Sequence, residues 1–172
     1  MSNYRRAFEQ GGYYLFTLVT HDRQLILSQP HKIQRLKESF THVMATRPFV
    51  IEAIVILPDH LHCIWQLPEG DGDFSTRWRL IKRHFSIAVE TPLTKRSEKL
   101  VWQRRFWEHL IRNEEDWRRH MDYIHYNPVK HGYVQNPMDW AHSSFIQATN
   151  LGWYPRNWGC QEPKNLQGMD LE

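Results

Sequence analysis

The chain has little cysteine, no long hydrophobic run and no glycine-rich phosphate-binding motif. Its two cysteines, Cys63 and Cys160, are too few for a disulfide framework. No apolar run approaches the length that crosses a bilayer, and the basic N-terminus is not followed by the apolar segment of a secretion signal. Neither a Walker nor a Rossmann glycine motif occurs, so no nucleotide cofactor is expected. These absences predict a cytoplasmic protein with no membrane partner.

The composition leaves two interpretations open. The net charge is +3 with a pI near 8.9, and the 172 residues include 8 Trp, 7 Tyr and 8 Phe, an aromatic share of 13%. Basic charge interleaved with aromatic side chains suits contact with phosphates and stacking on exposed bases. The same aromatic residues equally suit a tryptophan-rich core. The length fits one domain with a proper core.

Hydrophobic periodicity divides most of the chain into strands and helices. We expect strands at 13–20, 49–57, 60–67 and, with a bend near its middle, 101–111, with Pro58 and Asp59 in the turn between the second and third strands. Helices are expected at 30–46, after the loop 68–73, and at 113–127. Pro128 should end the last helix. This order predicts an α+β fold, a ferredoxin-like split β-α-β antiparallel sheet with the first two helices on one face. Residues 136–172 lose this periodicity and are expected to form a C-terminal extension packed on a domain of residues 1–135.

A histidine pair begins the third predicted strand. Side chains alternate along a strand, so His60 and His62 point to one face while Leu61, Cys63 and Trp65 point to the other. Two neutral imidazoles at this spacing can share a divalent metal ion, which then needs a further ligand from elsewhere. Because the chain has 11 His, two ordinary histidines at a strand start remain the alternative.

The last predicted helix offers a phenol and an amide on one face. Tyr123 and Asn127 are one turn apart and project together. An amide oxygen is an acceptable ligand for Mg²⁺ or Mn²⁺, so Asn127 would complete a set with His60 and His62, and the phenol could attack a phosphate held there. Tyr126 is the rival nucleophile, but it lies about 100° around the helix from Asn127. Plain core packing of a tyrosine-rich helix stays the alternative.

These segments carry a resemblance to a known family. The matching motifs are His60-Leu61-His62 and the stretches 11–14, 101–107, 123–132 and 140–145. On them the chain resembles the HUH single-tyrosine transposases, and specifically the REP-associated tyrosine transposases. The resemblance implies a ferredoxin-like domain whose tyrosine-bearing helix lies against the histidine face. Many relatives outside this group have Gln where this chain has Asn127, so the shorter amide is a departure.

The resemblance also implies a metal-dependent endonuclease and strand transferase for single-stranded DNA. With Mg²⁺ or Mn²⁺ held by His60, His62 and Asn127, Tyr123 would attack a phosphodiester in line and leave a 5′-phosphotyrosine and a free 3′-OH. A phenol with an ordinary pKa near ~10 needs help to ionise, and the nearby cation is the expected source. The implied substrate is a REP palindrome folded into a hairpin next to a short unpaired guide.

Basic side chains are the candidate DNA contacts, through phosphates and with salt-sensitive binding. They lie on the second helix, in the loop after it, and near the bend of the fourth predicted strand: Arg77, Arg79, Lys82, Arg83, Lys95, Arg104 and Arg105. A solvated helix face is the alternative for each. In the tail, Trp140, Trp153 and Trp158 could stack on bases or pack on the domain, and packing is expected for at least two of them.

Three other functions are compatible with parts of this pattern. Another HUH endonuclease, a replication initiator or relaxase, would share the metal and the tyrosine. A non-catalytic nucleic-acid binder with an RRM-like sheet would instead need stacking aromatics on an open sheet face. A metal-dependent hydrolase could use other histidines such as His109, His120 or His131. Because the tyrosine and the histidine pair lie in one compact domain, a monomer is expected rather than a dimer.

Overall fold

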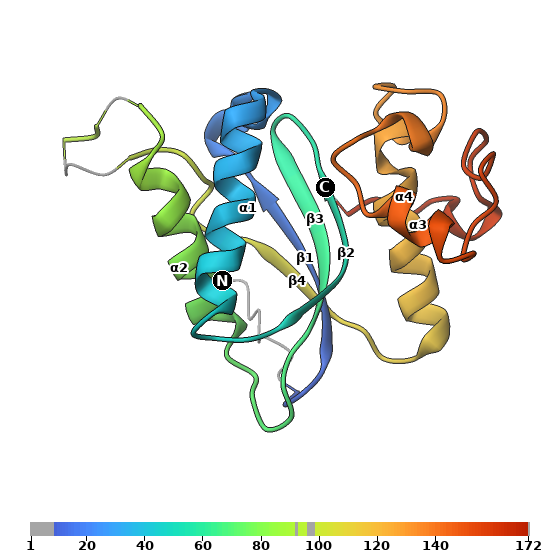
Figure 1. Ribbon diagram of the computed structural model, residues 1–172, viewed down its shortest axis with the longest axis horizontal. Coiled ribbons are helices and arrows are strands. Elements are labelled where there is room, and N and C mark those ends of the chain that lie inside the picture. The colour runs from blue at the N-terminus through green and yellow to red at the C-terminus, as the bar shows by residue number, and fades with distance from the viewer. Residues whose placement is uncertain (1–8, 92, 96–98, 172) are drawn as a thin grey trace.

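The fold is a four-stranded antiparallel sheet with helices on both faces (Figure 1). A computed structural model describes residues 9–91, 93–95 and 99–171. The strands are β1 (Tyr13–Val19), β2 (Val50–Ile56), β3 (His60–Gln66) and β4 (Trp107–Leu110), in the sheet order β2-β3-β1-β4. The helices are α1 (Pro30–Met44), α2 (Phe74–Ile87), α3 (Glu114–Lys130) and the short α4 (Phe145–Asn150), with 3-10 turns η1 (His21–Arg23), η2 (Ile26–Ser28), η3 (Pro137–Asp139) and η4 (Lys164–Leu166).

The layers confirm the predicted ferredoxin-like arrangement. In Figure 1, α1 and α2 lie on one side of the sheet, while α3 and the C-terminal segment lie on the other. The strand order and the antiparallel pairing of all neighbours are those of a split β-α-β fold. The helix expected to carry the tyrosine therefore lies on the sheet face opposite α1 and α2.

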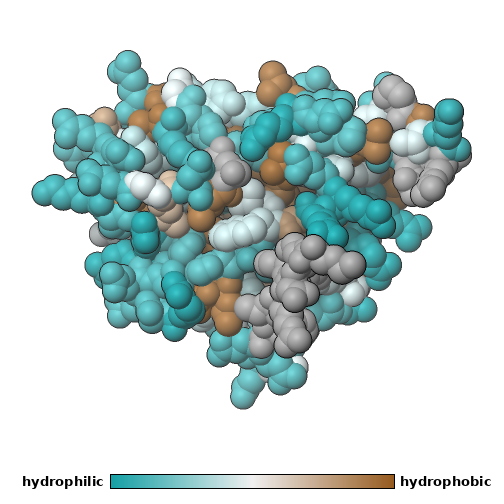
Figure 2. Space-filling model, turned by 180° about the vertical axis from the view of Figure 1, so that it is seen from behind, coloured by the Kyte–Doolittle hydropathy of each residue, from teal (hydrophilic) through white to brown (hydrophobic). Residues whose placement is uncertain are grey.

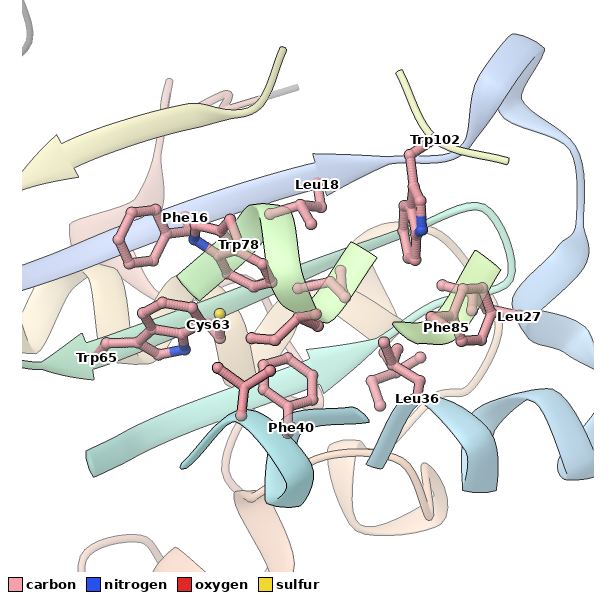
Figure 3. Packing of buried hydrophobic residues seen from close by; sticks show 14 of the residues in the cluster. Phe16, Leu18, Leu27, Leu36, Phe40, Cys63, Trp65, Trp78, Phe85 and Trp102 are labelled. Carbon is pink, nitrogen blue, oxygen red and sulfur yellow. The ribbon is translucent and has the colours of Figure 1, made fainter. Parts of the chain in front are cut away.

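Aromatic side chains fill the core between the sheet and the first two helices (Figure 3). Strand alternation sends Phe16 and Trp65 to this side, where the Trp65 and Trp78 rings stack with centroids 4.2 Å apart. Phe16 packs on Trp78 from the neighbouring strand at 5.4 Å. Cys63 is buried in the same cluster and Cys160 is exposed, and both are free thiols. Several of the tryptophans thus serve as core residues.

The opposite sheet face packs against α3 through a smaller apolar cluster. Leu15, Val55 and Ile64 point to this side and meet Met121 and Ile124 of the helix. These two are members of the apolar stripe that the helical spacing predicts. This apolar stripe sets the rotation of α3 about its own axis. The α3 residues next to the stripe therefore face the first half of β3.

The fourth strand is shorter than expected. Only Trp107–Leu110 pairs with β1, and Trp102 makes a single bridge to Thr20. Between them Gln103, Arg104 and Arg105 are exposed. Three consecutive polar side chains give neither sheet face an apolar residue to bury, so continuous pairing with β1 is confined to Trp107–Leu110.

The last helix continues past Pro128, contrary to the expectation that this proline ends it. A proline removes one N–H, but the following donors still close the turn: His131 N donates to the Asn127 carbonyl (3.1 Å) and Gly132 N to the Val129 carbonyl (2.9 Å). The helix ends where Gly132 takes φ +71°. This extra turn places Lys130 on the helix and His131 at its C-cap.

The C-terminal segment covers the open edge of β2. Ser144 N donates to the Ile54 carbonyl and Ile56 N to the His142 carbonyl, both at 2.9 Å. Trp140 donates to the Ile56 carbonyl and packs on the α3 cluster, and Trp158 packs on Phe145 at 5.6 Å. Trp153 is half exposed. Packing is thus confirmed for two of the three tail tryptophans.

The face of the molecule opposite to the view of Figure 1 is mainly polar. Figure 2 shows a mostly hydrophilic face with scattered apolar side chains. Among the described residues, no helix is long and apolar enough to cross a membrane. Part of the predicted loop after α2, at residues 92 and 96–98, lies outside the described residues.

Candidate active site

The two histidines of β3 lie on the α3 side of the sheet, as strand alternation predicts. His60 and His62 are both buried, and their ring centroids are 5.1 Å apart. Their neighbours Leu61, Cys63 and Trp65 belong to the core on the other side.

Each histidine ring is held through its Nδ1 atom. Asp59 Oδ1 lies 2.6 Å from Nδ1 of His60, and Thr17 Oγ1 lies 2.8 Å from Nδ1 of His62. Burial alone would raise the pKa of Asp59, but hydrogen bonding and charge from His60 and Arg23 outweigh it, so the pKa is lowered. The resulting carboxylate accepts a hydrogen bond from the Nδ1–H group, which makes Nε2 of His60 the nitrogen suited to bind a metal.

One face of α3 lies along the histidine pair. The Tyr123 ring meets His62 with centroids 5.3 Å apart, and the His131 ring meets His60 at 5.1 Å. These contacts are eight residues apart, about two helical turns, and Asn127 lies midway between them on the same stripe. The helix therefore aims a phenol and an amide at the two imidazoles.

The surroundings of the Asn127 side chain suit a role as a metal ligand. Its side chain is fully buried, and neither its oxygen nor its nitrogen has a hydrogen-bond partner among the described residues. Burying such an amide without a partner costs free energy, so it needs a compensating role. Two imidazoles and an amide oxygen form a reasonable donor set for Mn²⁺ or Mg²⁺.

The Tyr123 hydroxyl is buried and has polar neighbours from two segments. Lys130 Nζ donates to it at 3.1 Å, and the backbone N–H of Leu171 lies 3.3 Å away. Lys130 also forms an ion pair with Asp170 at 3.1 Å. The end of the described chain thus lies directly beside this hydroxyl. In Figure 1 the C-terminal end of the chain lies between the sheet and α3.

Sequence reasoning missed the residues that surround the histidines and the tyrosine. Thr17 could have been found, because it is a polar residue in an apolar strand, directly opposite His62 in the register. Asp59 had been assigned only to a turn. Lys130, seven residues after Tyr123, lies about two turns along the same helix, but the expected stop at Pro128 hid it.

One predicted DNA contact, Arg77, is wrong. Its side chain is 2% exposed and pairs with Asp71 at 2.7 Å, and it donates to the carbonyls of Arg47, Pro48 and Asp73. The guanidinium therefore joins the start of α2 to the segment before β2. Its hydrogen-bonding capacity is used inside the protein, which leaves nothing to offer a phosphate.

We expect Arg77→Ala to lower the free energy of unfolding by about 3 kcal/mol, because a partly buried carboxylate and three carbonyls lose their donor. Urea denaturation measures this. Arg79→Ala, an exposed neighbour on α2, is the control and should change the value by less than about 0.5 kcal/mol. Unchanged stability with weakened DNA binding in Arg77→Ala would restore the original assignment.

The other predicted contacts are distributed over two regions. Arg79 and Arg83 are exposed on α2, across the sheet from Tyr123, and Lys95 is exposed in the following loop. Lys82 is half buried, which lowers its pKa, and it donates to the Gln103 carbonyl at 2.8 Å. Arg104 is exposed in the stretch before β4, and its neighbour Arg105 lies near the candidate site. Arg105 lines a cavity of about 330 Å³ with other residues of β1, the tail and the stretch before β4: Thr17, Val19, Gln103, Trp107, Asp170 and Leu171.

Two of the histidines proposed for a hydrolase form a separate cluster. His109 Nε2 lies 2.9 Å from Asp116 Oδ2, and His120 Nδ1 lies 3.2 Å from Asp116 Oδ1. Burial alone would raise the pKa of Asp116, but hydrogen bonds from Arg112 and His109 hold it well below its usual range. Burial lowers the pKa of His120. His131, the third histidine proposed there, lies instead beside His60.

Comparison with known proteins identifies the class. Residues 9–127 match the family described as "Transposase IS200 like". The chain therefore belongs to the IS200-like family of single-tyrosine HUH transposases, metal-dependent enzymes that transfer DNA strands.

The relatives then define the group within that family. Over 160 residues the chain is 48% identical to the REP-associated tyrosine transposase of Escherichia coli (strain K12), with 92% of this chain and 91% of that protein covered. A solved structure of a REP-associated tyrosine transposase bound to a REP hairpin superposes with a TM-score of 0.81 at 44% identity, covering 96% of each chain. The group is thus the REP-associated tyrosine transposases. An RRM-like binder does not fit, because α3 covers the sheet face that such a protein leaves open.

Proposed function

We propose that this protein cleaves and rejoins single-stranded DNA next to REP-type hairpins through a covalent bond between Tyr123 and a 5′-phosphate. The observation that carries the proposal is the position of the Tyr123 phenol, which contacts His62 at its ring and Lys130 at its oxygen. A nucleophile, a cation and a histidine pair converge there in a protein whose relatives include one bound to a REP hairpin.

The chemistry needs no energy-rich cofactor. The Tyr123 oxygen attacks phosphorus, its bond to phosphorus forms as the bond to the 3′-oxygen breaks, the phenol proton is lost and the 3′-oxygen gains a proton. The ammonium of Lys130, 3.1 Å from the attacking oxygen, favours the anionic form of the nucleophile. Attack by a second 3′-OH reverses the step and joins a new strand.

His60, His62 and Asn127 would hold a divalent ion of the Mg²⁺ or Mn²⁺ class, which supplies positive charge to the non-bridging phosphate oxygens when bound. The carboxylate of Asp59 and the hydroxyl of Thr17 keep the two rings in place for this task. The buried amide of Asn127 gains the partner that it lacks within the described residues.

We propose that Arg105 makes the DNA contact nearest the cleaved bond. Contacts farther along the DNA are assigned to the exposed residues Arg79, Arg83, Lys95 and Arg104. We expect Arg105→Ala to weaken binding of a REP hairpin with its single-stranded flank and to reduce the slope of log K against log salt by about 1. Fluorescence anisotropy at several salt concentrations measures both. Arg118→Ala, which removes an exposed arginine paired with Glu114, is the control. Equal slopes for wild type and Arg105→Ala would exclude this contact.

We propose a monomer that acts in cis, because Tyr123 contacts His62 of its own chain. Sedimentation velocity should give the mass of one chain. A mixture of Tyr123→Phe and His62→Ala proteins should not cleave DNA, because neither chain has both parts of the site. Recovery of cleavage in the mixture would instead indicate exchange of α3 between chains.

The function is tested with single-stranded DNA that carries a REP hairpin, labelled at one end, and Mn²⁺ or Mg²⁺. We expect a protein–DNA adduct on a denaturing gel and a cleaved product with a free 3′-OH. Binding of the hairpin without any adduct, in either metal, would contradict an enzymatic role for this site.

A further inference from the structure

A second group of potential metal ligands lies outside the proposed catalytic site. His109 of β4 and Asp116 and His120 of α3 each offer a ligand atom, and these atoms all lie within 4.8 Å of one another. The two imidazole rings stack with centroids 4.4 Å apart, next to the carboxylate. Two imidazole nitrogens and one carboxylate oxygen are a donor set typical of zinc.

The cluster is distinct from the histidine pair of β3. On β1, the register places His62 opposite Thr17 and His109 opposite Leu15, so the two groups lie on different strands on either side of β1. On α3, His120 precedes Tyr123 by about one turn. An ion bound here would not touch the proposed nucleophile, but it would join the helix that carries it to the sheet.

Arg112 binds the carboxylate oxygen of Asp116 that would otherwise be available to a metal ion. Its Nε donates to Asp116 Oδ2 at 3.1 Å and its backbone N–H donates to the same oxygen at 3.0 Å. The Arg112 side chain is 70% exposed, so it can move into solvent without opening the core. The ligand atoms are already close together, since His109 Nε2 lies 2.9 Å from Asp116 Oδ2 and His120 Nδ1 lies 3.2 Å from Asp116 Oδ1. His120 Nδ1 also lies 2.7 Å from the backbone carbonyl of Asp116, so this ring would coordinate the ion either through Nε2 or through Nδ1 after giving up that contact.

We propose that His109, Asp116 and His120 bind a zinc-class divalent ion that ties the first turns of the tyrosine-bearing helix to β4, with the remaining coordination position open to water. The site is structural, since its ligands come from two elements that it would hold together. It is independent of the proposed catalytic function, because its readouts are metal binding and stability without DNA.

The test uses the full-length protein without DNA, titrated with Zn²⁺ by calorimetry and with Co²⁺ by visible absorption. We expect His109→Gln to lose one equivalent of bound metal, or to bind it at least about tenfold more weakly, relative to wild type. Saturating Zn²⁺ should raise the Tm of wild type more than that of His109→Gln. Asp116→Asn is the second variant, and melting curves in EDTA establish that each variant is folded.

Two control variants separate a metal site from an ordinary ion pair. Arg112→Ala removes the competing cation but no ligand, so it should bind Zn²⁺ more tightly than wild type. His42→Ala disrupts another stacked histidine pair, with His84 at 4.3 Å, in which Ser39 rather than a carboxylate bonds the ring; it should leave binding unchanged. Zinc binding that is equal in wild type, His109→Gln and Asp116→Asn, or that weakens in Arg112→Ala, overturns the proposal.

Discussion

Replacing Tyr123 by Phe is expected to reduce formation of the covalent DNA adduct by at least about 10³-fold. The substitution removes only the hydroxyl that Lys130 and the Leu171 amide contact, while the ring keeps its packing against His62. Hairpin binding should therefore change little. Denaturing gels measure the covalent protein–DNA adduct, and fluorescence anisotropy with the same DNA measures hairpin binding.

Tyr126→Phe is the matched control for this prediction. Tyr126 is the adjacent candidate on α3, but its side chain is turned away from the stripe that faces the histidines, and burial together with Glu162 raises its pKa. We expect Tyr126→Phe to keep most of the activity. An adduct that survives Tyr123→Phe and disappears in Tyr126→Phe would reverse the assignment of the nucleophile.

Replacing Asn127 by Leu is expected to raise the stability of the protein while lowering its metal binding and DNA cleavage. Both polar atoms of this buried amide lack a hydrogen-bond partner among the described residues, and Leu has a similar volume. Without metal, the variant should be more stable than wild type by about 1 kcal/mol, because an unpaired buried amide is removed. Mn²⁺ affinity and DNA cleavage should both fall by at least about tenfold.

Asn127→Gln is the companion variant, since it keeps an amide oxygen as a ligand. It should retain more metal binding than Asn127→Leu. Urea denaturation in EDTA gives the stability and calorimetry with Mn²⁺ gives the affinity. If Asn127→Leu is less stable than wild type and binds Mn²⁺ equally well, the amide has a packing role and is not a ligand.

The periodic features of the chain predicted most of the fold. Period-two alternation correctly separated His60 and His62 from Leu61 and Cys63, because in a strand that separation depends only on neighbours in sequence. Helical spacing similarly placed Met121 and Ile124 toward the sheet. Local rules were less reliable at element ends. The exposed residues 103–105 shortened the fourth strand, and Pro128 was accommodated within α3.

The charge of a side chain did not predict whether it is buried or exposed. Arg77 and Arg79 both stand among the polar residues of one amphipathic helix, yet Arg77 is buried and Arg79 is exposed. The difference comes from Asp71 and from carbonyls before β2, which approach Arg77 only when the chain folds. No pattern within α2 contains that information.

The sequence alone thus determined the strand that presents two imidazoles on one face, the helix that presents Tyr123 with Asn127, and the family that the motifs resemble. These depend on backbone periodicity, which short stretches of chain encode by themselves. Only the tertiary structure decided that Thr17 and Asp59 hold the rings, that Lys130 reaches the Tyr123 oxygen, and that His109 meets Asp116 and His120. The contacts of Thr17 and His109 join separate strands and helices, and that of Lys130 spans two turns of a helix past a proline, so their distances depend on packing of the whole domain. Asp59 is adjacent to His60, and its contact depends on the geometry of the turn between β2 and β3.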